Sequence, residues 1–297
     1  MLMLSLQQGF LYGLLALGVY LSFRILDIPD LTTEGSFTLG LAVSAMVTLA
    51  GQPLLSLPVA FLAGMAAGAI TALLQTKVGV PPILAGIITM SGLYTVNLMV
   101  MGSAPNVTIS GKTVFRALYK ALPELSKDAA KLLVSAALCL LVLGLLIWFF
   151  KTHLGLCVRA TGDNPAMVRA SSINVDRMKL LGLTLSNGCV ALSGAIVAQY
   201  QGYADISGGV GMVVVGLASV IIGEAFLGKR GVTVGLCSAI VGSIVYRFIL
   251  SLALSTDLFP AYYLKLVSAA IVALALCVPT LRGAARGARR KREARKC

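Results

Sequence analysis

The chain has 297 residues, of which 58% are hydrophobic and only 12% charged, and its mean hydropathy is +0.93. This balance excludes a soluble globular domain and indicates a protein that crosses a membrane several times. The net charge of +13 does not indicate nucleic-acid binding, because the basic residues lie between apolar runs and in a tail from Arg282 to Lys296. That placement is typical of cytoplasmic loops that face anionic lipid.

Apolar runs separated by glycine, proline and charged residues predict the membrane helices. A helix needs about 20 apolar residues to cross the hydrocarbon core, so the chain has room for about eight to ten spans. The predicted fold is all-α, a polytopic membrane helix bundle formed by one domain over residues 1–281, with a basic cytoplasmic tail over 282–297. The expected helices are 3–23, 36–50, 54–75, 83–101, 129–150, 178–199, 211–227, 232–252 and 262–279.

Charged side chains and a helix-breaking proline interrupt the apolar pattern after the first span: Arg24, Asp27, Pro29, Asp30 and Glu34. Charge near a bilayer is costly unless it is paired, solvated or facing a cavity, and broken backbone needs protein or water around it. We interpret Arg24 and Asp27 as a pair in a plain cytoplasmic turn. For Thr32, Thr33 and Glu34, a gate or pathway role and a structural role are both open.

Polar side chains inside the later spans are further candidates for a transport pathway. They are Asn97, Ser186, Asn187 and Gln199. Hydrogen bonds between helices or a wet passage would each explain such residues. Glu224 also lies in an apolar run, just before a basic turn, so its side chain can reach the membrane interface. Structural pairing and transport chemistry are both open for Glu224.

Loop charge predicts the orientation of the spans. The longest charged interruption, residues 151–177, is rich in Lys and Arg and is therefore expected on the cytoplasmic side together with the tail. Alternation then places residues 102–128 outside. A short amphipathic helix from Arg116 to Leu122 is expected there, on the membrane surface.

The cytoplasmic loop between the fifth and sixth spans contains a helix-start signal. Asp163 or Asn164 can cap a helix whose first residue is Pro165, because proline has a preset backbone angle and lacks the amide that would be unsatisfied there. The sequence therefore predicts a short cytoplasmic helix that exposes Met167 and Arg169 to a partner. A plain surface loop is the alternative.

A motif in the same loop resembles that of a known family. The pattern Gly-x-x-x-Arg-Ala-x-Gly-x-Asn-Pro begins at Gly155 and is followed by Ile173-Asn174-Val175. It is similar to the cytoplasmic coupling loop of the branched-chain amino acid/ribose family of ATP-binding-cassette (ABC) permeases. Weaker likenesses elsewhere extend the resemblance over nearly the whole chain. The resemblance implies the membrane-spanning permease subunit of an ABC importer, with a fold like that of type II importers.

In that family the coupling loop forms a short helix that docks in a groove of the ATPase subunit. The resemblance therefore implies a coupling role for Gly155, Arg159, Ala160, Gly162, Asp163, Asn164, Pro165, Met167 and Arg169. It also implies a homodimer, an external solute-binding protein and a multi-pass location in the bacterial cytoplasmic membrane. ATP and magnesium are expected in the partner ATPase, because this chain has no Gly-x-x-x-x-Gly-Lys-[Ser/Thr] phosphate loop.

The segment before the second span bears on the transported solute. Branched-chain permeases typically carry Asn-Phe-Ala-His-Gly where this chain has Leu31-Thr32-Thr33-Glu34-Gly35. The pattern Asp30-Leu31-Thr32-x-Glu34-Gly35 is similar to that of a subgroup of permeases paired with tryptophan- or tyrosine-binding lipoproteins. The resemblance therefore favours an amino acid as the solute.

No chemical reaction is expected within the chain itself. The lone His153 lies in the basic loop, and no nucleophile, base and orienting group can be assembled from the sequence. The six cysteines are scattered singly, without metal-ligand spacing. Neither an enzyme nor a metal or cofactor site is therefore predicted. The alternative function is a secondary transporter driven by an ion gradient, with Glu34 and Glu224 as proton or sodium sites.

Overall fold

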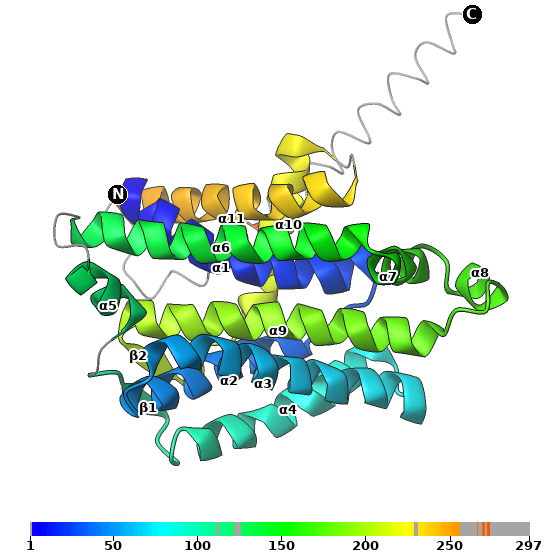
Figure 1. Ribbon diagram of the computed structural model, residues 1–297, viewed down its shortest axis with the longest axis horizontal. Helices are drawn as coiled ribbons and strands as arrows, with labels where there is room; N and C mark the ends of the chain where they lie inside the picture. The colour runs from blue at the N-terminus through cyan, green and yellow to red at the C-terminus, as the bar shows by residue number, and fades with distance from the viewer. Residues whose placement is uncertain are drawn as a thin grey trace, which may run out of the picture.

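The computed structural model of the protein describes residues 2–110, 113–121, 126–228 and 231–255, together with positions 266, 269, 270, 272 and 273. This part of the chain is a bundle of long helices that lie side by side, with two short strands at one end (Figure 1). Six helical segments in it are long and apolar enough to cross a membrane: Leu2–Ile25, Pro53–Val78, Pro82–Val100, Lys127–Lys151, Val175–Gln201 and Val232–Ala253. The predicted all-α membrane bundle is confirmed.

The observed helices follow the predicted spans closely. In chain order the elements are α1 Leu2–Tyr20, the π-helical turn η1 Leu21–Ile25, α2 Thr32–Leu49, α3 Pro53–Leu73, the π-helical turn η2 Leu74–Val78, α4 Pro82–Val100, β1 Asn106–Thr108, α5 Val114–Ala121, α6 Lys127–Lys151, α7 His153–Asp163, α8 Pro165–Ala170, α9 Val175–Gln201, β2 Tyr203–Asp205, α10 Met212–Leu227 and α11 Val232–Ser255. Proline is the first residue of α3, α4 and α8, where its missing amide costs nothing. The ninth predicted span, 262–279, lies largely outside the described residues.

Helices α1 and α9 form the centre of the bundle. Most residues of both are buried, and α9 packs against α1, α2 and α3. Helices α4 and α6 instead leave most of their surface exposed, including the apolar side chains of Ile88, Leu141 and Trp148. Lipid tails solvate such side chains as well as a protein interior does, so these surfaces suit contact with the hydrocarbon core.

Small and hydroxylated residues let the central helices approach closely. The Ser193 hydroxyl on α9 donates a 2.7 Å hydrogen bond to the carbonyl oxygen of Leu11 on α1. A Cβ atom on Gly40 of α2 would overlap the carbonyl oxygen of Ala191 on α9, so these two backbones nearly touch. Close packing and interhelical hydrogen bonds thus hold the helices together where lipid removes the hydrophobic force between them.

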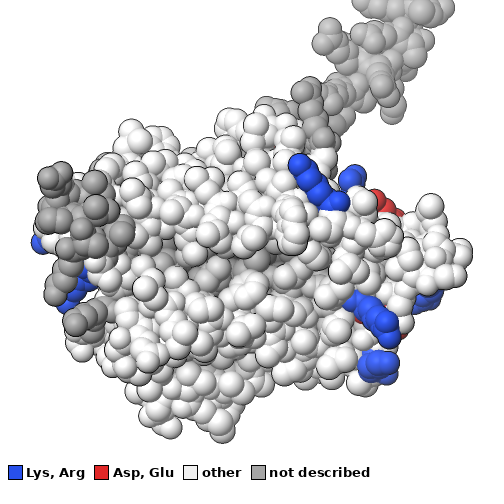
Figure 2. Space-filling view, viewed as in Figure 1, with Lys and Arg blue, Asp and Glu red and all other residues white. Residues whose placement is uncertain are grey.

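Charged side chains gather at the two ends of the bundle. Figure 2 shows an uncharged surface between the ends on the face in view, with Lys and Arg clustered at the end that carries α7 and α8. Lys151, Arg159 and Arg169 belong to this end. The positive-inside rule makes it the cytoplasmic end. Helix α1 begins at the opposite end, where α5 and the two strands also lie (Figure 1).

The loops at the opposite end are folded. Strand β1 pairs with β2 in an antiparallel sheet in which Val107 lies opposite Ala204. This pairing ties the loop after α4 to the loop after α9. Helix α5, Val114–Ala121, confirms the short helix predicted in this region.

Candidate transport pathway and coupling surface

A buried polar network surrounds Asp30 in the irregular segment between η1 and α2. The two carboxylate oxygens of Asp30 accept hydrogen bonds from the Thr32 amide at 2.9 Å and from Asn187 Nδ2 at 2.7 Å. Asn187 Oδ1 in turn accepts from the Ser36 hydroxyl at 2.7 Å. The network fixes the irregular backbone within the protein, as a membrane environment requires.

Thr32 and Thr33, two of the predicted gate residues, lie in this buried region. The Thr32 hydroxyl is 2.8 Å from the hydroxyl of Thr71 on α3, and the Thr33 hydroxyl donates to the Asp30 carbonyl oxygen at 3.1 Å. Both side chains are fully buried. These contacts hold the start of α2 in place, and a gate role for the two threonines stays a prediction.

Glu34 and Asn97 lie together at one cavity. It has a volume of about 480 Å³ and lies between α2, α4 and the segment that precedes α10. The other lining residues are Gly35, Thr38, Met90, Ser91, Tyr94, Ile206, Gly209 and Val210. Asn97 Nδ2 donates to the carbonyl oxygen of Gly35 at 3.2 Å, but Asn97 Oδ1 is buried without a hydrogen-bond partner among the described residues. The cavity therefore combines a carboxylate, an amide whose buried oxygen has no hydrogen-bond partner among the described residues, and apolar walls.

Glu34 also holds the start of α10. Its Oε1 accepts a 2.9 Å hydrogen bond from the amide of Gly211, the residue immediately before that helix. Gly211 has a φ of 85°, a left-handed conformation that costs glycine little. A negative charge at a helix N-terminus is favourable. No signal in the sequence predicts this contact, because capping patterns are recognised only within a few residues of the helix start.

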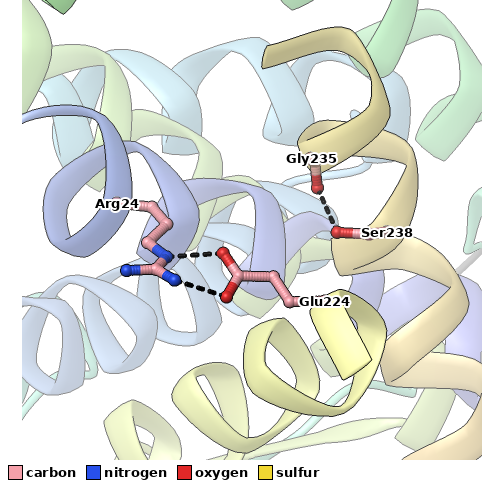
Figure 3. A network of polar contacts seen from close by, with 4 residues as sticks. All are labelled: Arg24, Glu224, Gly235 and Ser238. Atoms are coloured by element: carbon pink, nitrogen blue, oxygen red, sulfur yellow. Dashed lines mark hydrogen bonds and ion pairs between the residues drawn. The ribbon is translucent and has the colours of Figure 1, made fainter. Parts of the chain in front are cut away.

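At the cytoplasmic end, Arg24 and Glu224 form a bidentate ion pair that joins η1 to the last turn of α10 (Figure 3). Both of its hydrogen bonds measure 2.5 Å. The expected pairing of Arg24 with Asp27 is wrong, because the guanidinium points to α10 and Asp27 is exposed. A pathway role for Glu224 stays a prediction, and the ion pair gives it a structural role.

The predicted short cytoplasmic helix is present as α8. Asn164 Oδ1 caps it by accepting hydrogen bonds from the amides of Ala166 and Met167, both at 3.1 Å. Met167 is 68% exposed, and Figure 1 shows α8 projecting beyond the ends of the long helices. The preceding residues, expected to be a loop, form the second cytoplasmic helix α7.

The predicted coupling residues divide between these two helices. Gly155, Arg159, Ala160, Gly162 and Asp163 lie on α7, Asn164 lies between the helices, and Pro165, Met167 and Arg169 lie on α8. A Cβ atom on Gly162 would overlap the carbonyl oxygen of Ile25 in η1, so α7 packs directly on the end of the first span. A hollow of about 210 Å³ is lined by Arg159 and Asp163 of α7 and by both members of the Arg24–Glu224 pair. Helix α7 therefore adjoins the ion pair.

These features define the class of protein. The described part of the chain has no group of three or more His, Cys, Asp or Glu side chains that could hold a metal ion. It consists of membrane helices, with a cavity between α2, α4 and the segment before α10, and with two short helices at the cytoplasmic end. This is the architecture of a helical membrane permease.

Comparison with known proteins identifies the family. Residues 1–276 match the family described as branched-chain amino acid transport system, permease component. The chain belongs to this family. It is the multi-pass permease of an ABC import system for a small solute.

Three relatives illustrate the range of similarity. A tyrosine transport system permease protein of Clostridioides difficile is 34% identical over 89% of this chain and 86% of its own length. An uncharacterized protein of Rickettsia prowazekii is 35% identical over 75% of this chain and 76% of its own length. The ribose import permease protein of Escherichia coli is 27% identical over 92% of this chain and 83% of its own length. No solved structure shows a significant match to the chain.

Proposed function

We propose that this permease imports an amino acid and that α7 and α8 form its docking surface for a separate ATPase. An aromatic amino acid is favoured because the relative from Clostridioides difficile is named as part of a tyrosine transport system. In this proposal, two copies of the chain enclose the substrate path and a solute-binding protein delivers the amino acid from outside. One ATPase binds beneath each copy, where it holds ATP and magnesium and hydrolyses the ATP.

The observation that carries this proposal is the projecting helix α8. Its apolar Met167 side chain is 68% exposed at the cytoplasmic end. This side chain therefore gains no hydrophobic free energy from burial within the permease. The Asn164 cap and Pro165 fix the start of α8 without any partner. A preformed helix with an exposed apolar side chain suits insertion into a groove of another protein.

Contacts inside the permease supply a route from α8 to the cavity. Helix α7 packs on η1 at Gly162, and the Arg24–Glu224 pair joins η1 to the end of α10. Helix α10 has 16 residues and is therefore about 24 Å long at 1.5 Å per residue. Its other end is held by Glu34. An ATPase that contacts α7 and α8 differently in two nucleotide states would shift α10 and so change the cavity.

The docking surface can be tested with the variant Met167→Asp. A carboxylate at this position would have to be desolvated in the ATPase groove, so the complex should be weakened by at least about tenfold. The permease is co-expressed with its ATPase and purified through a tag on the permease. The amount of ATPase retained is then measured, together with ATP-driven uptake in proteoliposomes.

Val78→Asp is the matched control for this experiment. Val78 is also 68% exposed and ends η2, but it belongs to neither α7 nor α8. The control should retain the ATPase. Retention of the ATPase and normal uptake by Met167→Asp would refute the proposed docking surface.

A further inference from the structure

We propose that the cavity between α2 and α4 is a binding site for a primary ammonium group attached to an apolar body, with Glu34 and Asn97 as the ammonium acceptors. This inference deepens the proposed function and rests on it, since it names the part of the amino acid that the permease recognises. The cavity volume of about 480 Å³ falls in the range of pockets that hold small molecules.

Glu34 supplies the negative charge of this site. One carboxylate oxygen is engaged by the Gly211 amide, and no ion pair to Glu34 is found within the described part of the chain. A carboxylate within a membrane bundle is costly unless a cation, water or a cavity compensates it. Glu34 lines the cavity, so its carboxylate can meet a cation there in addition to the amides of Gly211 and Val213 at the start of α10.

Asn97 supplies an independent indication of a missing donor. Its side chain is 1% exposed, and its Nδ2 is engaged by the Gly35 carbonyl oxygen, which fixes the orientation of the amide. Asn97 Oδ1 is left without a partner in the described structure. Native proteins rarely leave a buried acceptor unsatisfied, because doing so costs free energy. An ammonium group has three donors and could serve both Glu34 and Asn97.

The remaining walls fit an apolar group beside the ammonium. Met90, Ile206 and Val210 present aliphatic side chains, and Tyr94 adds an aromatic ring. An aromatic ring with a short aminoalkyl chain therefore matches both halves of the lining. Because Glu34 also caps α10, a cation bound here would touch the same carboxylate that positions the helix leading to the cytoplasmic ion pair.

The test measures binding of tritiated tyramine to the full permease in lipid nanodiscs, without ATPase or binding protein. Tyramine carries the ammonium and the aromatic ring. Unlabelled tyrosol, which has a hydroxyl in place of the ammonium, and 3-(4-hydroxyphenyl)propionate, which has a carboxylate there, serve as competitors. We expect saturable binding that excess tyramine displaces and the two competitors do not. Because no ATPase is present, a failure of the proposed coupling would leave this result unchanged.

Glu34→Gln tests the carboxylate directly. The glutamine oxygen can still accept from the Gly211 amide, so the variant removes the charge while keeping the contact to α10. Tyramine affinity should fall by about tenfold or more, as expected for loss of a charge-assisted hydrogen bond. Asp176→Asn, which makes the same change at an exposed carboxylate in the first turn of α9, should bind like the original chain.

Three results would overturn the inference. They are absence of saturable tyramine binding at millimolar concentration, equal competition by tyrosol, and unchanged affinity in Glu34→Gln. The competition series uses the unaltered chain, so it decides the inference even if the variant fails to fold. Substrate uptake that persists without any tyramine binding would reject this site while leaving the proposed transport function standing.

Discussion

Asp30 is the residue on which the irregular segment before α2 depends. Its carboxylate accepts hydrogen bonds from the Thr32 amide and from Asn187 Nδ2, which also donates to the Leu183 carbonyl oxygen. Leucine would leave the Thr32 amide and one of the two N–H groups of Asn187 without an acceptor. We expect Asp30→Leu to lower the free energy of unfolding by about 2–6 kcal/mol, since each of the two buried N–H groups left without an acceptor costs about 1–3 kcal/mol. Denaturant unfolding of the purified permease in detergent measures the change.

Two conservative variants serve as controls for this prediction. Asp30→Asn keeps an oxygen for the Thr32 amide, and Asn187 can rotate its amide to meet the new NH₂ group, so a smaller loss is expected. Asp27→Asn alters an exposed carboxylate nearby and should leave stability unchanged. An Asp30→Leu variant as stable as the original chain would show that the network does not hold the segment.

At the residue scale, local chemistry was predictable and long-range pairing was not. The cap at Asn164 follows from residues within one helical turn, and it was predicted, with Asp163 as the other option. The sequence favours Asp27, the carboxylate three residues away, as the partner of Arg24, whereas the partner in the structure, Glu224, lies 200 residues along the chain. The sequence contains several carboxylates that could pair with Arg24. Which of them does so depends on how the helices pack.

At the element scale, the contact between α2 and α9 depends on the missing side chain at Gly40. Valine there would collide with the carbonyl oxygen of Ala191 and push the two helices apart. We expect Gly40→Val to lower the free energy of unfolding by about 1–3 kcal/mol, the usual effect of overpacking. Gly92→Val on α4 has open space around it and should be neutral. Equal thermal stability of the two variants in detergent would contradict the prediction.

The positions of the long helices were predictable because apolar runs bounded by polar breakers mark them directly. The sequence does not predict helix α7, since His153–Asp163 contains two glycines and several polar residues, and this helix is stabilised by packing on η1 and α9. The cavity was missed as a unit although Glu34 and Asn97 were both candidates. Their meeting depends on how α2, α4 and the segment before α10 pack, which the periodicity of single helices does not determine.

At the scale of the whole molecule, charge and architecture give one orientation in the membrane. The end with α7 and α8 carries Lys151, Arg159 and Arg169, and it lies beyond an uncharged surface (Figure 2). Moving such a cluster across a bilayer is unfavourable, which is the basis of the positive-inside rule. The proposed ATPase lies in the cytoplasm. The proposed docking surface and the charge pattern therefore both place α7 and α8 on the cytoplasmic side of the membrane. Strand β1 belongs to the opposite end.

Cysteine labelling tests this orientation on intact cells. Met167→Cys on α8 and Asn106→Cys on β1 both introduce exposed thiols, at opposite ends of the bundle. Among the native cysteines, Cys139, Cys157 and Cys189 are buried and Cys237 is partly buried, so a background with Cys277→Ser and Cys297→Ser should label weakly. A membrane-impermeant maleimide should modify Asn106→Cys in intact cells and Met167→Cys only after the membrane is opened. Labelling of Met167→Cys in intact cells would show that the orientation is the opposite of the one assigned here. Because ATP is supplied in the cytoplasm, that result would also rule out α8 as the ATPase docking surface.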